Sequence, residues 1–308
     1  MLFRSNMLTS QPQIKARIIA DFGRNFIAQC VQSKQQYHCY TRGKRTGIAV
    51  GDFVLLDIHG KEQATIEKRL NRENLLYRSD NQRSKLFAAN IDQLFFVLAP
   101  QPDFSMDLIG RAYIASKNAN IQMYILLNKA DLPQITKARK RLKPLEKLEI
   151  PIIETSIYAI DVLKEKLLPL LAKRTTLLLG QSAMGKSSIL NVLVPNARAQ
   201  TQEHSKALGS GRHTTTDTRL YQLPKINGSI IDSPGFQSFG LAHLEIEDLL
   251  KGFPDFHEAL KNCRFYNCTH RHEPSCGVLA AKTQGGINKQ RYQLYLRLMN
   301  ELESRPLY

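Results

Sequence analysis

A short segment rich in glycine and serine has the composition of a phosphate-binding loop. Residues 180–187 read GQSAMGKS, which matches the pattern G-x-x-x-x-G-K-[S/T]. In such a loop the backbone N–H groups surround the α and β phosphates of a nucleotide at the start of a helix. Lys186 would reach the β and γ phosphates, and the hydroxyl of Ser187 would bind Mg²⁺. The segment therefore predicts a nucleoside triphosphate site.

A second motif, NKAD at residues 128–131, has side chains that can distinguish guanine from adenine. The Asp131 carboxylate can accept hydrogen bonds from guanine N1–H and the exocyclic amine, and Asn128 can address the O6 and N7 side. Lys129 would lay its aliphatic stem along the base or the loop. Adenine would leave the carboxylate unpaired, so the motif favours GTP over ATP.

A third motif has the residues of a magnesium and γ-phosphate site. Residues 229–235, SIIDSPG, form an apolar strand that ends in D-x-x-G. Asp232 would hold Mg²⁺ directly or through water, and the N–H of Gly235 would meet the γ phosphate. Residues 209–218, GSGRHTTTDT, have the glycine and threonine content of a loop that closes on Mg²⁺ and phosphate. Among the threonines at 214–216 we favour Thr215 as the metal contact.

The order of these motifs, base reader before phosphate loop, is the reverse of that in ordinary GTPases. A circular permutation permits this order, because a site needs strand ends that are neighbours in the sheet and not in the sequence. Buried strands that alternate with helices predict a parallel sheet covered on both faces. The predicted strands are 90–99, 121–127, 149–156, 175–179 and 229–232, and the predicted helices are 106–118, 133–148, 160–172 and a helix from about 186.

The N-terminal segment has a different pattern. Residues 13–70 alternate in five short β-rich segments separated by turn residues, which predicts a small antiparallel barrel of the OB type. Cys30 and Cys39 are expected in its core. The basic segment TRGKRTG, residues 41–47, is either a projecting RNA contact or a solvated turn.

A cysteine-rich segment near the C-terminus has the ligands of a zinc site. Residues 263–276 read CRFYNCTHRHEPSC, so that Cys263, Cys268, His270 and Cys276 supply three thiolates and one imidazole. Spacing alone leaves His272 as a rival to His270. Zinc would hold together a segment too small for its own core, and the nearby basic and aromatic residues (Arg264, Phe265, Tyr266, Arg271) could then face RNA. A helix is expected near 286–303, with an apolar stripe for packing.

The amino-acid composition limits the kinds of partner that the chain is expected to bind. The chain has 308 residues, and Lys and Arg exceed Asp and Glu by 43 − 27 = 16, with a pI near 9.7. Such a charge favours a polyanion, either nucleic acid or an anionic membrane. No apolar run approaches the ~18 residues that span a bilayer. An odd number of cysteines in a chain of this length favours a reducing compartment, so we expect a cytoplasmic protein, and we expect a monomer.

These motifs together resemble the RsgA (YjeQ) family of circularly permuted GTPases that act on the small ribosomal subunit. The resemblance covers nearly the whole chain: GRNF, TRGKRTG, NIDQLFFVLAPQPDFSMDLIGR, LNKAD, GKSS, GRHTTTDT, DSPGF, CRFYNCTHRHEPSC and RYQLYLRL. It implies a multidomain fold with an OB barrel (residues 1–75), a permuted P-loop GTPase domain (76–240) and a mostly helical zinc-binding domain (241–308). It also implies GTP hydrolysis stimulated by the small (30S) subunit, a role in late subunit maturation, and contacts to 16S rRNA.

The resemblance also implies a set of site residues. The GTP-binding residues would be Asn128, Lys129, Ala130, Asp131, Ser156, Gly180, Gln181, Ser182, Ala183, Met184, Gly185, Lys186, Ser187, Ser188 and Gly235, with Mg²⁺ at Ser187, Thr215 and Asp232 and one zinc at Cys263, Cys268, His270 and Cys276.

The sequence departs from this family at three positions. Ala183 replaces the middle glycine of the loop, which would cost about 1 kcal/mol if the position needs a positive φ. Gln181 stands where proline is usual. The last guanine-site element, commonly Ser-Ala, is Ser156-Ile157.

The residue that positions the hydrolytic water is not evident from the motifs. Phe236 follows D-x-x-G where many GTPases have glutamine, and a phenyl ring cannot hydrogen-bond water. His213 is the candidate catalytic residue; the alternative is that it belongs to the switch and binds nothing. A GTP-gated RNA-binding assembly factor with little hydrolysis is the alternative function, whereas a phosphotransferase is disfavoured because NKAD selects guanine and no acceptor-site acid or base stands out.

Overall fold

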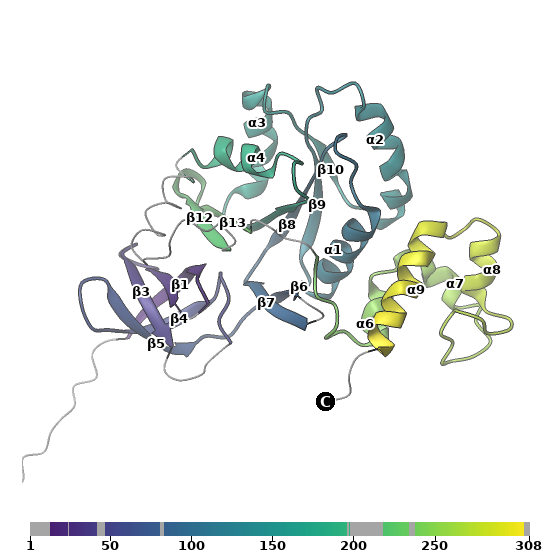
Figure 1. The fold of residues 1–308 in the computed structure, drawn as a ribbon, viewed down its shortest axis with the longest axis horizontal. Helices are drawn as coiled ribbons and strands as arrows, with labels where there is room; N and C mark the ends of the chain where they lie inside the picture. Colours follow the sequence, from purple (N-terminus) through teal and green to yellow (C-terminus); the bar gives the residue numbers. More distant parts are fainter. Residues whose placement is uncertain are drawn as a thin grey trace, which may run out of the picture.

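The computed structural model describes residues 13–23, 25–41, 47–80, 83–195, 197, 218–233 and 238–304, without the side chains at 79, 80, 83 and 84. Three parts follow one another along the chain: a β-barrel, an α/β sheet with helices on both faces, and a helical C-terminal unit packed beside α1 (Figure 1).

Five strands form the predicted barrel. They are β1 (Ile14–Asp21), β2 (Asn25–Cys30), β3 (Gln36–Thr41), β4 (Phe53–Ile58) and β5 (Gln63–Arg69). The pairings run β1-β2-β3-β5-β4, and β4 returns to β1, which closes the sheet on itself. Alternate residues point inward, as in β5, and Cys30 and Cys39 are buried as expected. Of the basic segment, residues 42–46 lie outside the described parts.

A two-stranded hairpin follows the barrel and was not predicted from the sequence. It consists of β6 (Leu75–Asp80) and β7 (Arg83–Ala89). One bridge joins Ala88 to Val50 in the barrel, and another joins Arg78 to Phe239, just beyond the D-x-x-G motif. The hairpin therefore contacts both the barrel and the segment that leaves the nucleotide motifs.

The central sheet has the strand order β10-β9-β8-β11-β13-β12, in which all neighbours are parallel except β12. Its strands are β8 (Gln93–Leu98), β9 (Gln122–Leu127), β10 (Ile152–Glu154), β11 (Thr175–Gly180), β12 (Arg219–Leu223) and β13 (Gly228–Asp232). The strands β8, β11 and β13 are buried at every position, as the continuous apolar runs predicted. The motif strands therefore end along one edge of the sheet, although they are far apart in sequence.

Helices cover both faces of this sheet. Figure 1 shows α3 (Ile160–Leu171) and α4 (Lys186–Leu193) on one side, and α1 (Met106–Asn118) and α2 (Ile135–Leu142) on the other. The prediction of one helix over 133–148 was wrong in part, because α2 gives way to the 3₁₀ helix η1 (Lys143–Leu148). Pro144 has no N–H for an α-helical bond and its ring crowds the preceding turn, so the α-helix ends before it.

The barrel and the central sheet are joined along their edges. A pairing of Ala20 in β1 with Arg219 in β12 makes one continuous sheet. Arg17 crosses the same junction, where it donates to the Thr175 hydroxyl at 2.9 Å and to the Asn90 carbonyl at 3.3 Å. Burial lowers the pKa of Arg17 to about 10, so the guanidinium stays charged at neutral pH and holds the two parts together.

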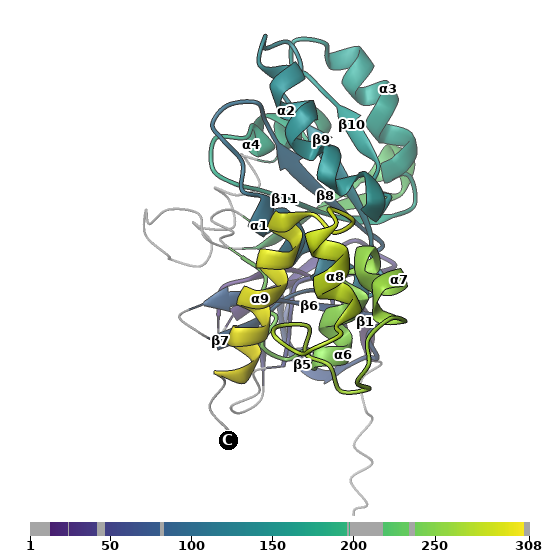
Figure 2. The same cartoon turned by 90° about the vertical axis from the view of Figure 1, so that its right-hand side faces the viewer.

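The C-terminal unit packs around a cluster of aromatic rings. It contains α6 (Ile246–Lys251), η3 (Pro254–Phe256), α7 (His257–Leu260), α8 (Gly277–Thr283) and the long α9 (Lys289–Glu303), which lies in front of α1 in Figure 2. Phe253 and Phe256 meet the ring of Tyr295 at 5.4 Å between centroids in each case. The Asn288 side chain caps α9 by accepting from the N–H groups of Gln290 and Arg291.

Candidate functional site

The phosphate loop lies between β11 and α4, as its sequence predicted. Two of its glycines are required by close packing. A Cβ on Gly180 would lie 2.7 Å from the Val97 carbonyl oxygen, and one on Gly185, which has φ +89°, would lie 2.2 Å from the Asn128 side-chain nitrogen. The loop therefore approaches neighbouring strand ends as closely as a backbone without side chains allows.

Ala183 has the backbone conformation that its sequence position suggested. Its φ is +63°, in the left-handed region that an L-residue adopts only at a cost of about 1 to 2 kcal/mol. The Ala183 side chain is exposed, so little burial offsets this strain. The loop thus contains a strained alanine where glycine would fit without strain.

Two residues of the NKAD motif hold the phosphate loop directly. Asn128 is 1% exposed, and its Nδ2 donates to the Met184 carbonyl at 3.0 Å. Lys129 Nζ donates to the Ala183 carbonyl at 2.8 Å and to the Gln101 carbonyl at 2.9 Å. The two motifs, more than fifty positions apart in sequence, are therefore in direct contact. That the Asn128 side chain also holds the phosphate loop could not be read from spacing.

The outer part of the NKAD motif meets the next strand end. The Asp131 carboxylate accepts a hydrogen bond from the Ser156 hydroxyl, which in turn accepts from the Tyr158 N–H at 3.2 Å. Asp131 is exposed, whereas Ser156 is half-buried. The carboxylate and the Ser156-Ile157 element are thus neighbours, as the guanine-site interpretation requires. Tyr158, 84% exposed beside them, was not singled out from the sequence.

Two residues predicted to bind phosphate and Mg²⁺ pair with each other. Lys186 Nζ forms an ion pair with the Asp232 carboxylate, and both side chains are largely buried. Leu178 of β11 pairs with Asp232 at the end of β13. The loop that follows β11 and leads to Lys186 therefore lies beside the end of β13. Ser187 is exposed at the start of α4. His213, Thr215, Gly235 and Phe236 lie outside the described residues.

The cysteine and histidine side chains of the C-terminal unit converge. One ligand atom from each of Cys263, Cys268, His270 and Cys276 lies within 4.8 Å of the others. His270 Nδ1 is 3.5 Å from each of the sulfurs of Cys263 and Cys276, which are 4.0 Å apart. A tetrahedral zinc ion requires about 3.5 to 3.6 Å between sulfur and nitrogen ligands and about 3.8 Å between sulfurs. The donor set and its spacing therefore fit zinc.

The geometry selects His270 over its rival His272. His270 is 4% exposed, has a φ of +56°, and its carbonyl accepts from the Tyr292 hydroxyl at 2.8 Å. His272 is not part of the converging group. Burial lowers the pKa of His270, which keeps the imidazole in the neutral form that binds metal.

One of the clustered cysteines, Cys268, is poorly placed to ionise without a cation. Burial and the nearby sulfurs of Cys276 and Cys263 raise the pKa of Cys268 to about 12. Thiolates so close together repel one another, and a divalent ion removes this repulsion when it replaces their protons. The cluster can therefore hold a metal ion.

Glu273 organises the loop between the ligands, a role that the sequence did not reveal. Its carboxylate accepts from the Thr269 N–H at 2.6 Å and from the backbone N–H groups of Arg271 and His272 at 3.0 and 3.2 Å. Burial alone would raise the pKa of Glu273, but hydrogen bonds from the Thr269 hydroxyl and from the backbone N–H groups of Thr269 and Arg271 hold it far below its usual value. The Tyr295 hydroxyl donates to the Thr269 carbonyl at 3.0 Å. The ligand loop is thus shaped by its own residues and by α9.

The outer surface of the same loop exposes two aromatic rings. Tyr266 is fully exposed and Phe265 is 40% exposed. The Arg264 guanidinium lies 5.5 Å from the centre of the Phe265 ring. Such a group of flat, uncovered rings beside a cation suits stacking with unpaired bases.

No helix in the described parts of the chain is long and apolar enough to cross a bilayer.

Known proteins resemble this chain along most of its length. A family model described as RsgA GTPase matches residues 69–242. The chain is 52% identical over 293 residues to a protein of Bordetella pertussis named small ribosomal subunit biogenesis GTPase RsgA, with 95% of this chain and 97% of the relative covered. It is 47% identical to the protein of the same name from Paraburkholderia xenovorans, with 92% of each chain covered.

Two solved structures have the same fold along almost the whole chain. YjeQ from Thermotoga maritima aligns with a TM-score of 0.69 and 26% identity over 96% of this chain and 100% of its own. YloQ, described as a circularly permuted GTPase, aligns with a TM-score of 0.66 and 24% identity over 99% of this chain and 100% of its own. Both similarities agree with a barrel followed by a permuted nucleotide-binding sheet. On the family match and on the sequence identity along nearly its full length, the chain belongs to the RsgA GTPase family.

Proposed function

We propose that this chain binds and hydrolyses GTP during the late maturation of the small (30S) ribosomal subunit, in contact with 16S rRNA. The observation that carries this proposal is the joining of the base-reading motif to the phosphate loop by Asn128 and Lys129. One nucleotide can therefore be held by both motifs at once. The role in maturation of the small subunit is proposed from the names of the relatives. GTP as the ligand is proposed from the contacts between the two motifs.

Guanine recognition rests on the pair formed by Asp131 and Ser156. An exposed carboxylate that already accepts one hydrogen bond can accept two more, from guanine N1–H and the exocyclic amine. The proposed GTP contacts otherwise follow the loop from Gly180 to Ser188 and the motif from Asn128 to Asp131, with Gly235 at the γ phosphate.

Mg²⁺ would be held by Ser187 and Asp232, with Thr215 as the third protein contact. Hydroxyl and carboxylate oxygens suit this hard cation, which neutralises charge on the β and γ phosphates during transfer. In this structure Lys186 pairs with the Asp232 carboxylate. On nucleotide binding, we expect Lys186 to exchange this partner for the phosphate oxygens, which frees Asp232 for the metal.

Zinc is the ion that the Cys263, Cys268, His270 and Cys276 group fits best, because four protein ligands complete its tetrahedral shell. Its role would be structural, since no ligand position is left open for a substrate. The RNA-facing surface of this unit would be the exposed pair Phe265 and Tyr266.

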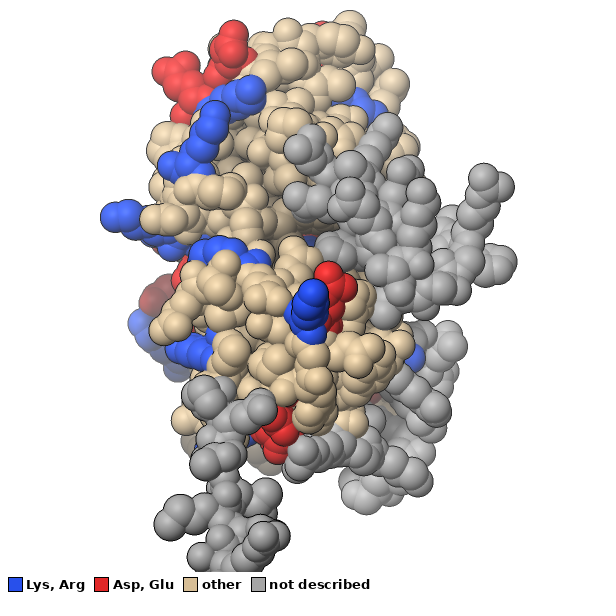
Figure 3. Space-filling view, turned by 90° about the vertical axis from the view of Figure 1, so that its left-hand side faces the viewer, with Lys and Arg blue, Asp and Glu red and all other residues tan. Residues whose placement is uncertain are grey.

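Charge supports a polyanionic partner, although the described residues on the face drawn in Figure 3 form no continuous basic surface. The chain carries a formal net charge of +16, but Figure 3 shows Lys and Arg side chains scattered in small groups among uncharged residues and some acidic ones. We propose a monomeric, cytoplasmic protein with domain boundaries near residues 75 and 240, and these points stay predictions.

The decisive experiment measures GTP turnover by the protein alone, with small subunits and with large subunits. We expect stimulation by small subunits only. No stimulation by any particle, with GTP still bound, would favour the alternative of a GTP-gated assembly factor with little hydrolysis, which Phe236 after the D-x-x-G motif favours. His213→Ala tests whether this residue orients the water: unchanged subunit-stimulated turnover with intact binding would exclude that role.

A base-exchange variant tests guanine recognition itself. Asp131→Asn replaces an acceptor oxygen by an NH₂ donor, so affinity should fall for GTP and rise for xanthosine triphosphate, whose base has a carbonyl in place of the exocyclic amine. Asp161→Asn, at the start of α3, is the matched control. A variant that loses GTP without gaining the xanthine nucleotide would contradict the proposed contact.

A further inference from the structure

The phosphate loop is attached to helix α1 by one side chain. The Gln181 Oε1 accepts a hydrogen bond of 2.7 Å from the backbone N–H of Ser105. Ser105 is the N-cap of α1, and its hydroxyl accepts from the Leu108 N–H at 3.3 Å. The Gln181 side chain therefore accepts from a backbone N–H at the start of α1 that has no partner within the helix, and this bond fixes the phosphate loop at that point.

A second side chain, that of Lys129, also joins the phosphate loop to the segment that precedes α1. Lys129 Nζ bridges the Ala183 carbonyl of the phosphate loop and the Gln101 carbonyl, which belongs to the segment between β8 and α1. The segment 99–105 is thus joined to the phosphate loop at Gln101 and at Ser105. A movement of α1 along its axis would strain both bonds.

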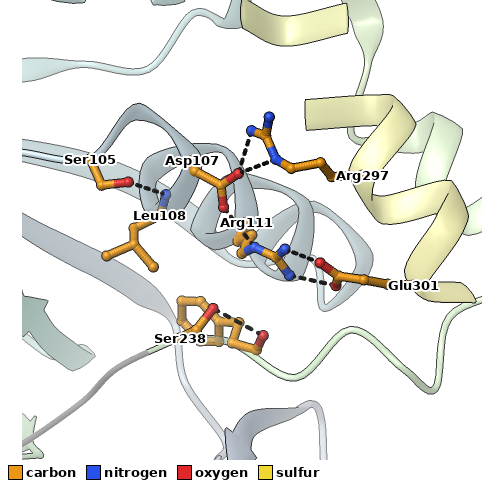
Figure 4. A network of polar contacts seen from close by, with 8 residues as sticks. Ser105, Asp107, Leu108, Arg111, Ser238, Arg297 and Glu301 are labelled. Atoms are coloured by element: carbon orange, nitrogen blue, oxygen red, sulfur yellow. Dashed lines mark hydrogen bonds and ion pairs between the residues drawn. The ribbon is translucent and has the colours of Figure 1, made fainter. Parts of the chain in front are cut away.

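Helix α1 in turn is clamped by α9 of the C-terminal unit (Figure 4). Asp107 accepts from Arg297 Nε at 3.0 Å and from Arg111 Nε at 2.7 Å. Arg111 also donates to the Glu301 carboxylate at 2.9 Å. The two helices pack closely, since a Cβ on Gly110 would lie 2.2 Å from a methyl carbon of Leu294. Four charged groups and a close backbone contact therefore hold α1 against α9.

The same α9 holds the metal-ligand loop through Tyr292 and Tyr295, whose hydroxyls donate to the carbonyls of His270 and Thr269. Arg271 of that loop forms an ion pair with Glu303 at the end of α9. An unbroken series of contacts thus runs from the phosphate loop through α1 and α9 to the metal cluster.

We propose that Gln181 is a positioning residue of the phosphate loop, through which the docking of α9 on α1 sets how firmly the loop holds a nucleotide. The inference rests on the proposed function, because it concerns the same GTP site. A loop that is already held in the binding shape loses less conformational freedom when phosphate enters. Release of this tie should therefore weaken nucleotide binding without direct removal of a phosphate contact.

The first test separates an effect of Gln181 on nucleotide release from an effect on the stability of α1. Gln181→Met keeps the length of the side chain and removes its acceptor, and it should speed release of a fluorescent GDP analogue about fivefold, the value of one lost hydrogen bond. Ser105→Ala removes the helix cap but keeps the backbone donor. It should lower the unfolding temperature and leave the release rate almost unchanged. If the two variants change release in proportion to their loss of stability, the positioning role is excluded.

The second test measures coupling across α1. Glu301→Gln breaks the ion pair with Arg111 and should speed release about threefold in an otherwise unchanged chain, but it should add nothing in the Gln181→Met background. Arg139→Gln is the matched control, because it breaks an exposed ion pair with Glu154 that includes no residue of α1 or α9. Independent effects of Gln181→Met and Glu301→Gln would overturn the proposed path.

The outcomes also distinguish this inference from the proposed function. Release rates of Gln181→Met equal to those of the unchanged chain overturn the inference alone. Failure of the unchanged chain to bind GDP would overturn the proposed function, and the inference with it.

Discussion

Replacement of Ala183 by glycine should stabilise the nucleotide-free protein. The φ of +63° at this position costs an L-residue about 1 to 2 kcal/mol, and glycine adopts it without strain. Glycine also gains freedom in the unfolded chain, which costs about 0.4 to 1 kcal/mol of stability. Because the Ala183 side chain is exposed, its removal sacrifices little buried surface. The balance is a gain of about 0.5 to 1 kcal/mol.

Scanning calorimetry without nucleotide measures this gain. In a domain of this size it corresponds to a rise of about 1 to 4 °C in the midpoint of unfolding. Ala242→Gly is the matched control, since Ala242 lies in an exposed turn and is not among the described residues with positive φ. The control has only the unfolded-state cost, so its midpoint should fall. The difference between the two variants isolates the backbone strain.

The reasoning fails if Ala183→Gly and Ala242→Gly lower the midpoint equally. That result would mean that the left-handed conformation of Ala183 carries no strain in the folded protein. A raised midpoint with weakened GDP binding would instead show that the strained loop contributes to the affinity.

Three further predictions concern stability and metal content. Asn128→Ala should lower the free energy of unfolding by about 2 to 3 kcal/mol even without nucleotide, because the buried carbonyl of Met184 loses its donor; an effect seen only with bound nucleotide would contradict this. His270→Ala should abolish binding of one zinc per chain in elemental analysis, whereas His272→Ala should retain it, and the reverse result would refute the ligand assignment. Burial alone would raise the pKa of Asp107, but hydrogen bonds from its two arginine partners hold it below its usual value. The stabilising effect of this carboxylate is therefore complete above the unfolded-state pKa of about 3.9 and is lost as the pH falls through the lower folded-state value. Asp107→Asn should therefore reduce the fall in the free energy of unfolding over this acidic range. An unchanged slope there would contradict the pairing.

The sequence by itself was sufficient for most of the secondary structure and for the identity of the motifs. Alternating side chains predicted the barrel strands, and continuous apolar runs predicted β8, β9 and β11, because burial on one or on both faces selects those patterns. The hairpin of β6 and β7 was missed because the last three residues of β6 and the first three of β7 are polar, which interrupts the apolar pattern. The strand β12 was missed because its five residues are defined by pairing with β13 and β1.

The tertiary structure decided which side chains meet. Spacing could not choose between His270 and His272, since both fit the distance along the chain, and only the turn of the backbone brings His270 to the sulfurs. Strand order brings Lys129 to the phosphate loop. The contact of Gln181 with Ser105 depends on where α1 begins beside that loop, and the contact of α1 with α9 depends on how the C-terminal unit docks. Local sequence determines hydrogen bonding along the chain, whereas these contacts arise from the packing of surfaces that no local pattern encodes.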